Sequence, residues 1–191
     1  IYHSPRAITL NRLFEKVLRD DLNSYVYDAN VAGMTYVVSV VPSAYRLSVS
    51  GYSQKLPHLL DVVTSRMSSL IQEMKEGDEA HPALAEIFLK AKDNLLRQTK
   101  NYIFESPYET GSYNLRMLHE SPAWHINDYM GEMEGEDAES EPLTMKECAE
   151  AAEKCLFGRS KAVSLCMGNI DEKGSKEVEK VIKKLQKGNF L

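Results

Sequence analysis

Histidine is the side chain that most often supplies a metal ligand or a general base at neutral pH. The chain has five histidines, and two of them, His119 and His125, fall in the segment HESPAWH. A helical zinc site of the H-x-x-E-H or H-E-x-x-H type needs ligands four residues apart on one face. Here the spacing is six, and Pro122 interrupts any helix between the two residues. We therefore predict a helix-end His119 and a loop His125, and no zinc site. The other three histidines, His3, His58 and His81, are isolated in the sequence.

The sequence also contains no motif that would activate a serine nucleophile. Neither Ser160 nor Ser164 stands in a G-x-S-x-G elbow, and the phosphate-binding patterns G-x-x-x-x-G-K-[ST] and G-x-G-x-x-G are absent from the sequence. Gly51-Tyr52-Ser53 and Gly168-Asn169 are predicted turns. We therefore predict no catalytic and no metal-binding residue in this chain, and the sequence identifies no substrate-binding residue.

The cysteines Cys148, Cys155 and Cys166 are odd in number and form no C-x-x-C pair. Small buried core residues are the favoured interpretation, and a reactive thiol, Cys166 above all, is the alternative. Free thiols and the lack of an N-x-[ST] acceptor predict an intracellular, cytoplasmic setting. The first residues lack a signal-peptide pattern and an initiator Met, so we expect a fragment or a processed product.

Charge is concentrated in one place. The net charge is −5, but residues 131–141, GEMEGEDAESE, carry six acidic side chains, and without them the chain has 23 basic against 22 acidic residues. No basic face is evident, which argues against nucleic acid and against an anionic membrane as partners. The acidic run is predicted to be a mobile, solvated loop, with attraction of a cationic partner as the alternative.

The elements that would position any site follow from the periodicity of apolar residues. Three-four spacing predicts helices, and β-branched residues in alternation predict strands. The predicted helices are 9–30, 57–76, 82–105, 108–119, 144–157 and 171–187, and the predicted strands are 34–41, 44–52 and 161–167. Gly33 should end the first helix, Asp171 should cap the last, and Thr144 with Glu147 matches a capping box.

This order predicts an α+β fold, in which a small antiparallel or mixed sheet with an early β-hairpin packs against several helices. Residues 1–191 form one domain in this interpretation, and a further strand is expected ahead of residue 1. The ten tyrosines, several of them in the first helix and the hairpin, either line a peptide-binding surface or belong to the ordinary core and its rim.

The run LRDDLNSYVYDANVAGMTYVVSVVPSAYRLSVSGYSQKLPHLLDVVTSRM resembles the third domain of zinc peptidases of the insulin-degrading-enzyme type (insulysin, pitrilysin and nardilysin). That family has a helix with L-x-D-x-L-x-x-x-x-Y, then A-x-x-A-G, an aromatic residue, and a hairpin ending in L-x-V-x-G-Y-x-x-K. LHESPAWHINDYM and SLCMGNIDEKGS are similar to later segments of the same domain. The matching residues of the first run are Leu18, Asp20 or Asp21, Leu22, Tyr25, Tyr27, Ala29, Ala32, Gly33, Tyr36, Leu47, Val49, Gly51, Tyr52 and Lys55.

The resemblance implies a metallopeptidase-type fold of the LuxS and processing-peptidase kind. In that family two halves enclose unfolded peptides in a chamber, and the first domain holds zinc through H-x-x-E-H. The third domain has no zinc site, so this chain should hold no cofactor and be inactive alone. An Arg and a Tyr that assist the family's reaction belong to its fourth domain, so neither role passes to Arg46 or Tyr45.

The expected function is therefore that of a non-catalytic domain in an insulysin-like zinc endopeptidase, which forms part of the substrate chamber. Its partners would be other domains of the same polypeptide and, in the intact enzyme, peptide substrates. The alternative is a scaffold or binding protein that reuses the fold without peptidase activity, as core subunits of processing peptidases and respiratory complexes do. Either way, Gly33 and the hairpin serve architecture, and Leu22 is expected in the core.

Overall fold

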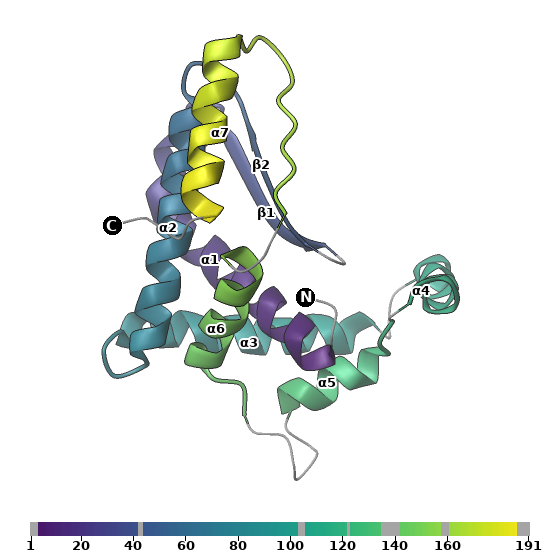
Figure 1. Ribbon diagram of the computed structural model, residues 1–191. Helices are drawn as coiled ribbons and strands as arrows, with labels where there is room; N and C mark the ends of the chain where they lie inside the picture. The colour runs from purple at the N-terminus through teal and green to yellow at the C-terminus, as the bar shows by residue number, and fades with distance from the viewer. Residues whose placement is uncertain are drawn as a thin grey trace.

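A computed structural model describes residues 4–41, 44–102, 106–121, 123–134, 142–157 and 161–186. Within these residues the chain forms seven helices and one two-stranded sheet, which confirms the predicted α+β class with an early hairpin (Figure 1). In chain order the elements are α1 (Pro5–Val31), β1 (Thr35–Val41), β2 (Ala44–Ser50), α2 (Leu56–Glu76), α3 (Pro82–Asn101), α4 (Pro107–His119), α5 (Ile126–Glu134), α6 (Met145–Leu156) and α7 (Glu172–Gln186).

Helix α1 begins earlier than its apolar periodicity predicts. Ser4 caps it, because the Ser4 hydroxyl accepts a hydrogen bond from the Ala7 amide at 3.1 Å and Pro5 fills the first turn. Its end agrees with the prediction. The helix stops at Val31, and Gly33 takes the left-handed conformation, with φ +80°, that glycine adopts without strain. The chain then enters β1 within two residues.

Strands β1 and β2 form an antiparallel hairpin whose register pairs Val38 with Leu47 and Tyr36 with Val49. These residues share the face that packs on the core, and Val38 is the most buried of them. Gly51 ends the hairpin in a conformation with φ +137°, and a side-chain carbon there would lie 2.7 Å from Met34 Cγ. Only glycine fits this close approach of the two strand ends without a shift.

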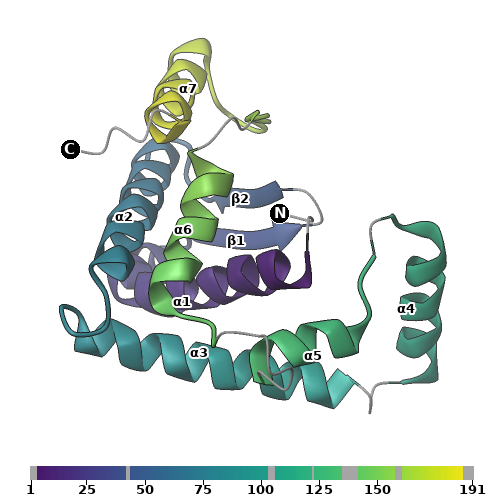
Figure 2. The ribbon, with the colours of Figure 1, turned by 60° about the horizontal axis from the view of Figure 1, so that its bottom comes forward.

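The core is centred on α1, which contacts α2, α3, α5, α6 and β1. Figure 2 shows α1 and α3 on one side of the hairpin and α2 with α6 on another. The side chains of α1 that face this core are almost fully inaccessible: Leu13, Phe14, Val17, Leu18 and Leu22 are each 0% exposed. Leu22 is thus a core residue, as predicted.

The predicted third strand is wrong. Residues 161–167 are extended but pair with no strand in the described part of the chain, and the sheet there has two strands only. All seven of these side chains are exposed. A run of alternating apolar residues is typical of a strand, but backbone pairing also needs a neighbour.

Helix α5 was not predicted. The predicted elements include no helix between residues 119 and 144, and residues 131–141 are predicted to be a loop, whereas α5 runs from Ile126 through Glu134. Glu132 and Glu134 are held there by ion pairs to Arg6 and Lys100. These partners lie far away in the sequence, which is why local charge density indicated a loop. Residues 135–141 lie outside the described residues, and for them the loop stays a prediction.

Two helices contribute no fully buried residue, α4 and α7. Helix α4 stands away from the rest of the molecule, between the end of α3 and the start of α5 (Figure 2). Helix α7 packs mainly along α2, with an ion pair between Lys184 and Asp61 at 3.2 Å. Asp171 caps α7 as predicted, because its carboxylate accepts the Gly174 amide at 2.7 Å.

Candidate functional site

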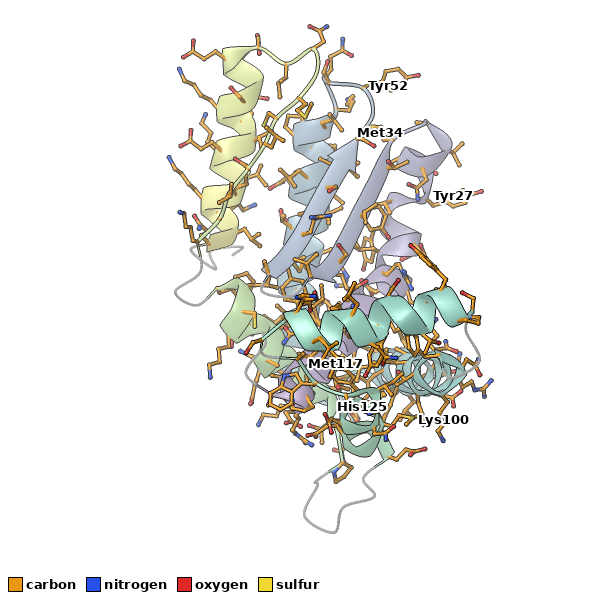
Figure 3. The ribbon with its side chains drawn as sticks, turned by 90° about the vertical axis from the view of Figure 1, so that its right-hand side faces the viewer. Tyr27, Met34, Tyr52, Lys100, Met117 and His125 are labelled. Atoms are coloured by element: carbon orange, nitrogen blue, oxygen red, sulfur yellow. The ribbon has the colours of Figure 1, made fainter. Side chains whose placement is uncertain are left out.

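A cavity of about 360 Å³ lies where α1, the end of α3, α4 and the start of α5 meet. This volume is within the range of ligand pockets, which runs from about 300 to 1,000 Å³. Figure 3 looks onto α4, with Met117 and His125 below it and Lys100 on the helix behind. The side chains that give the cavity its character are Arg12 and Lys16 of α1, Tyr102 after α3, Tyr113 and Arg116 of α4, and Tyr129 of α5.

One wall of the cavity is aromatic. The rings of Tyr102 and Tyr113 meet edge to face at 5.3 Å between centroids, and Tyr113 meets His125 at 6.0 Å. The Tyr113 hydroxyl accepts the Ile126 amide at 2.9 Å, which ties α4 to the first residue of α5. Because α4 has no buried residue, these ring contacts and this hydrogen bond are its main attachment.

Cationic side chains lie against the aromatic rings of the cavity. The Arg12 guanidinium of α1 lies over the Tyr129 ring at 5.2 Å, and Arg116 lies over Tyr113 of the same helix, α4, at 5.9 Å. Lys16 donates to the neutral Gln98 amide oxygen at 2.7 Å. Burial lowers the pKa of the Lys16 amine, and neighbouring Arg19 lowers it further.

A single carboxylate, Glu15, lines the cavity among the described residues, and it is already engaged. Glu15 accepts the Val40 backbone amide of β1 at 2.8 Å. Arg12 makes no ion pair within the described residues. The cavity therefore combines three cationic side chains, three tyrosine rings and one carboxylate that already accepts a backbone hydrogen bond. Side chains of these types can bind a carboxylate that lies beside an aromatic or aliphatic group.

The histidines lie where the sequence predicts them. His119 is the last residue of α4 and His125 precedes α5. His81 contacts Glu76 at 2.8 Å near the start of α3. The described residues hold no group of three or more His, Cys, Asp or Glu side chains that could bind a metal ion.

The cysteines divide between the core and the surface. Cys148 is fully buried in α6, as predicted, and its thiol donates to the Leu10 carbonyl at 3.3 Å. Cys155 is half-buried and Cys166 is exposed. The predicted burial of Cys166 in a strand is wrong, because residues 161–167 have no sheet neighbour.

The Asp position of the L-x-D-x-L pattern has a structural role here. Asp21 forms a bidentate ion pair with Arg66 of α2, at 2.6 and 2.8 Å, whereas Asp20 is exposed. Arg66 also pairs with Glu73 and lies over the Tyr25 ring at 4.8 Å. Asp21 and Tyr25, two of the residues that carry the resemblance, thus join α1 to α2.

Thr144 caps α6 as predicted, accepting the Glu147 amide at 3.2 Å. The Glu147 side chain does not complete the predicted capping box. It forms a bidentate pair with Arg6 at 2.6 and 2.7 Å instead, because a charged partner outweighs a backbone amide at the helix end.

The sequence model of one protein family, described as "Middle or third domain of peptidase M16", matches residues 1–132. The chain belongs to this family. The match covers the hairpin, the Asp21 pattern and the HESPAWH segment. It ends before α6 and α7, so the resemblance of residues 164–175 to the late part of the domain stays a prediction.

Individual relatives agree with this family. The chain is 30% identical over 137 residues to "Insulin-degrading enzyme-like 1, peroxisomal" of Arabidopsis thaliana, covering 70% of this chain and 13% of that protein. It is 31% identical over 123 residues to the insulin-degrading enzyme of Homo sapiens, covering 64% of this chain and 11% of the relative. The chain thus spans a small part of the length of these relatives.

A protein of Schizosaccharomyces pombe, named as a zinc protease, is 28% identical over 121 residues, which cover 63% of this chain and 11% of that protein. The Arabidopsis relative is named as peroxisomal, so a cytoplasmic location for this chain stays a prediction. Within the described residues, no helix has the length and apolar character needed to cross a bilayer.

The sequence does not predict the cavity. Tyr25, Tyr27 and Tyr52, in or near the first helix and the hairpin, are exposed and do not line it. The cavity tyrosines are Tyr102, which follows α3, Tyr113 of α4 and Tyr129 of α5. No short motif joins these three residues, and only the fold brings them beside Arg12.

Proposed function

We propose that this chain is a non-catalytic domain of an insulysin-like zinc endopeptidase and forms part of the chamber that encloses peptide substrates. The observation that carries the proposal is the match of residues 1–132 to a middle or third domain of a peptidase family. The zinc ion and its H-x-x-E-H ligands belong to another domain of the parent protein in this proposal. Peptides and the neighbouring domains are the partners of the chain.

The cavity between α1 and α4 is the part of this domain that holds peptide. Arg12 supplies a cation that no carboxylate of the described residues neutralises, and Tyr102, Tyr113 and Tyr129 supply flat apolar surface. A peptide offers a matching pair of groups where an acidic side chain or the C-terminal carboxylate lies near an aromatic residue. Binding there positions the peptide.

The test uses the full-length parent enzyme with Arg12→Gln. We expect KM for a peptide with an acidic C-terminal part to rise about tenfold, because a charge-assisted hydrogen bond contributes about 1.5–3 kcal/mol. We expect kcat and bound zinc to stay unchanged, and Arg12→Lys, which keeps the charge, to lose less. Arg97→Gln is the matched control, because Arg97 is an exposed arginine that pairs with Asp93 and does not line the cavity.

An unchanged KM in Arg12→Gln would remove peptide binding from this cavity. The wider proposal has its own test, which is zinc content and peptide turnover of the 191-residue chain beside the parent protein. We expect both only in the parent. A parent protein without any H-x-x-E-H motif and without peptidase activity would favour the alternative, a scaffold protein of the processing-peptidase or respiratory-complex type.

A further inference from the structure

Lys16 of α1 is the one lysine that lines the cavity between α1 and α4 in the described part of the chain. Its side chain is half-buried, and its Nζ atom donates to Oε1 of Gln98, on α3, at 2.7 Å. Lys90 of α3 shows the more usual arrangement, an ion pair with Glu86 at 2.7 Å. Lys16 forms no ion pair among the described residues. A neutral amide oxygen accepts a hydrogen bond from the charged or the neutral amine, whereas a carboxylate strongly favours the charged form.

The groups around Lys16 make its neutral form more accessible. Burial lowers the pKa of the amine, and Arg19 lowers it further, against the opposing effect of Glu15 and Asp20. A lysine that is desolvated or lies beside another cation is a stronger nucleophile, because more of it carries a free lone pair. The neutral amine still has an N–H that donates to Gln98, so this hydrogen bond positions the nitrogen in both forms.

The other cations of the cavity are placed to hold an anion beside this amine. Arg12 lies four residues before Lys16 and so on the same face of α1, and Arg116 comes from α4. Glu15, the single carboxylate of the described lining, already accepts a backbone amide. Arg116 has a distant, exposed partner, Glu120, at 3.8 Å. Two guanidinium groups match the double charge of a phosphate monoester, whose oxygens they bind through paired hydrogen bonds.

The rings and the size of the cavity restrict the rest of the ligand. Tyr102, Tyr113 and Tyr129 present flat surfaces on which an aromatic ring packs. A volume of about 360 Å³ lies near the lower end of ligand pockets, so it suits a ligand with one ring better than a dinucleotide. A ligand with one aromatic ring and one phosphate thus meets both kinds of side chain, with Lys16 beside them.

We propose that Lys16 is a covalent binding site for aromatic aldehydes that carry a phosphate group. The lone pair of the neutral amine attacks the aldehyde carbon, a C=N bond replaces the C=O bond, and the oxygen leaves as water with the two hydrogens of the amine. Protonation of the imine nitrogen restores an N–H that donates to Gln98. Arg12 and Arg116 hold the phosphate. The step needs no oxidant or reductant, and the inference does not depend on the proposed function.

The experiment uses pyridoxal phosphate as the probe, because it has one ring, one aldehyde and one phosphate. The 191-residue chain is mixed with less than an equivalent of the probe, borohydride reduces the imine to a stable amine, and peptide mapping by mass spectrometry locates the label. We expect Lys16 to carry at least about ten times as much label as Lys90, because a charge-assisted hydrogen bond to the phosphate favours binding by that factor. Equal labelling of the two lysines would overturn the proposal.

Two simpler aldehydes test the class of ligand. Pyridoxal lacks the phosphate, and glycolaldehyde phosphate lacks the ring. The ratio of label on Lys16 to label on Lys90 corrects for the intrinsic reactivity of each aldehyde. We expect this ratio to be about tenfold lower with pyridoxal, and lower also with glycolaldehyde phosphate, than with pyridoxal phosphate. An equal ratio with either simpler aldehyde would contradict the assigned ligand.

Arg12→Gln tests the contact with the phosphate. The labelling ratio should fall about tenfold with pyridoxal phosphate and stay the same with pyridoxal, because the variant loses one charge-assisted contact. Arg97→Gln is the matched control, since exposed Arg97 pairs with Asp93 and does not line the cavity. If Arg12→Gln kept the full ratio with pyridoxal phosphate, the proposed anion site would be wrong.

Gln98→Glu tests the amine itself. It places a carboxylate of the same size beside Nζ, which stabilises the charged amine, so label on Lys16 should fall several-fold with every aldehyde. Lys16→Arg keeps the charge and removes the nucleophile, and should abolish the label at this position. Far-UV circular dichroism checks that each variant is folded. Undiminished labelling in a folded Gln98→Glu variant would show that the surroundings of the amine do not make it reactive, and the proposal would fail.

These results are separate from the test of peptide binding. The KM measurement uses no aldehyde and leaves Lys16 intact, so a failure to label Lys16 would leave the peptide proposal standing. An unchanged KM in Arg12→Gln, together with selective labelling of Lys16, would support the aldehyde site and remove the peptide from the cavity.

Discussion

Helices α1 and α7 are both amphipathic, but their apolar faces are buried to very different extents. Ten residues of α1 are buried, among them Leu13, Phe14 and Leu22, whereas no residue of α7 is buried. The difference lies in the neighbours. Helix α1 is surrounded by α2, α3, α5, α6 and β1. Helix α7 packs along α2, and its Leu185 faces a hollow of about 1,030 Å³ that Ala44 and Tyr45 of β2 also line. Periodicity thus predicts a helix and the side it will bury, but burial itself depends on what else is present.

The largest expected effect comes from truncating one leucine in each helix. Leu22→Ala should lower the free energy of unfolding by about 2–5 kcal/mol, because it leaves a cavity in a filled core. Leu185→Ala should cost less than about 1 kcal/mol, because its side chain is only half-buried, beside the hollow. Urea unfolding followed by circular dichroism measures both, and equal costs would contradict the contrast between the two helices.

A smaller effect is expected from ion pairs in the two regions. The Arg66 and Asp21 side chains are 12% and 11% exposed, so Arg66→Met strands a largely buried carboxylate and should cost about 1–3 kcal/mol. The Lys183–Glu179 pair of α7 is 63% and 57% exposed. Lys183→Met should leave the free energy of unfolding nearly unchanged, because solvent screens such a pair. A cycle with Asp21→Asn isolates the coupling between Arg66 and Asp21, and a coupling near zero would contradict the role assigned to this pair.

Much of the fold follows from local signals. Three-four spacing places helices close to their observed bounds, Gly33 sets the end of α1, and the alternation of Tyr45, Leu47 and Val49 gives the hairpin and its inner face. These features depend on residues within one or two turns of each other, so the sequence carries them directly.

The features that the sequence does not predict depend on residues far away in the chain. Helix α5 is held by Arg6 and Lys100, which neither the acidic composition nor the connecting Pro122 reveals. Residues 161–167 have the composition of a strand but have no strand beside them to pair with in the described part of the chain. The cavity brings Arg12, Tyr113 and Tyr129 together from three helices, and no short motif predicts such a meeting. The residues of the family pattern, by contrast, were expected to have an architectural role. Asp21 has such a role, because its ion pair with Arg66 joins α1 to α2.

The smallest effect at neutral pH, and the last test of the comparison, concerns the core around α1, where the Cys148 thiol donates to the Leu10 carbonyl. Burial, and next the Glu147 carboxylate, raises the pKa of the Cys148 thiol. Above about pH 8.5, where an ordinary thiol ionises, the unfolded chain loses a proton that folded Cys148 keeps. Unfolding is then favoured, so the contribution of Cys148 to stability is complete below that pH and is lost as pH rises.

We therefore expect the free energy of unfolding to fall between about pH 8.5 and 10, and more steeply above that range, since burial also raises the pKa of Tyr45. Cys148→Ala should flatten the first part of this profile, whatever it does to stability at neutral pH. A profile that stays as steep in Cys148→Ala as in the unchanged chain would contradict the assignment of this pH dependence to the buried Cys148 thiol.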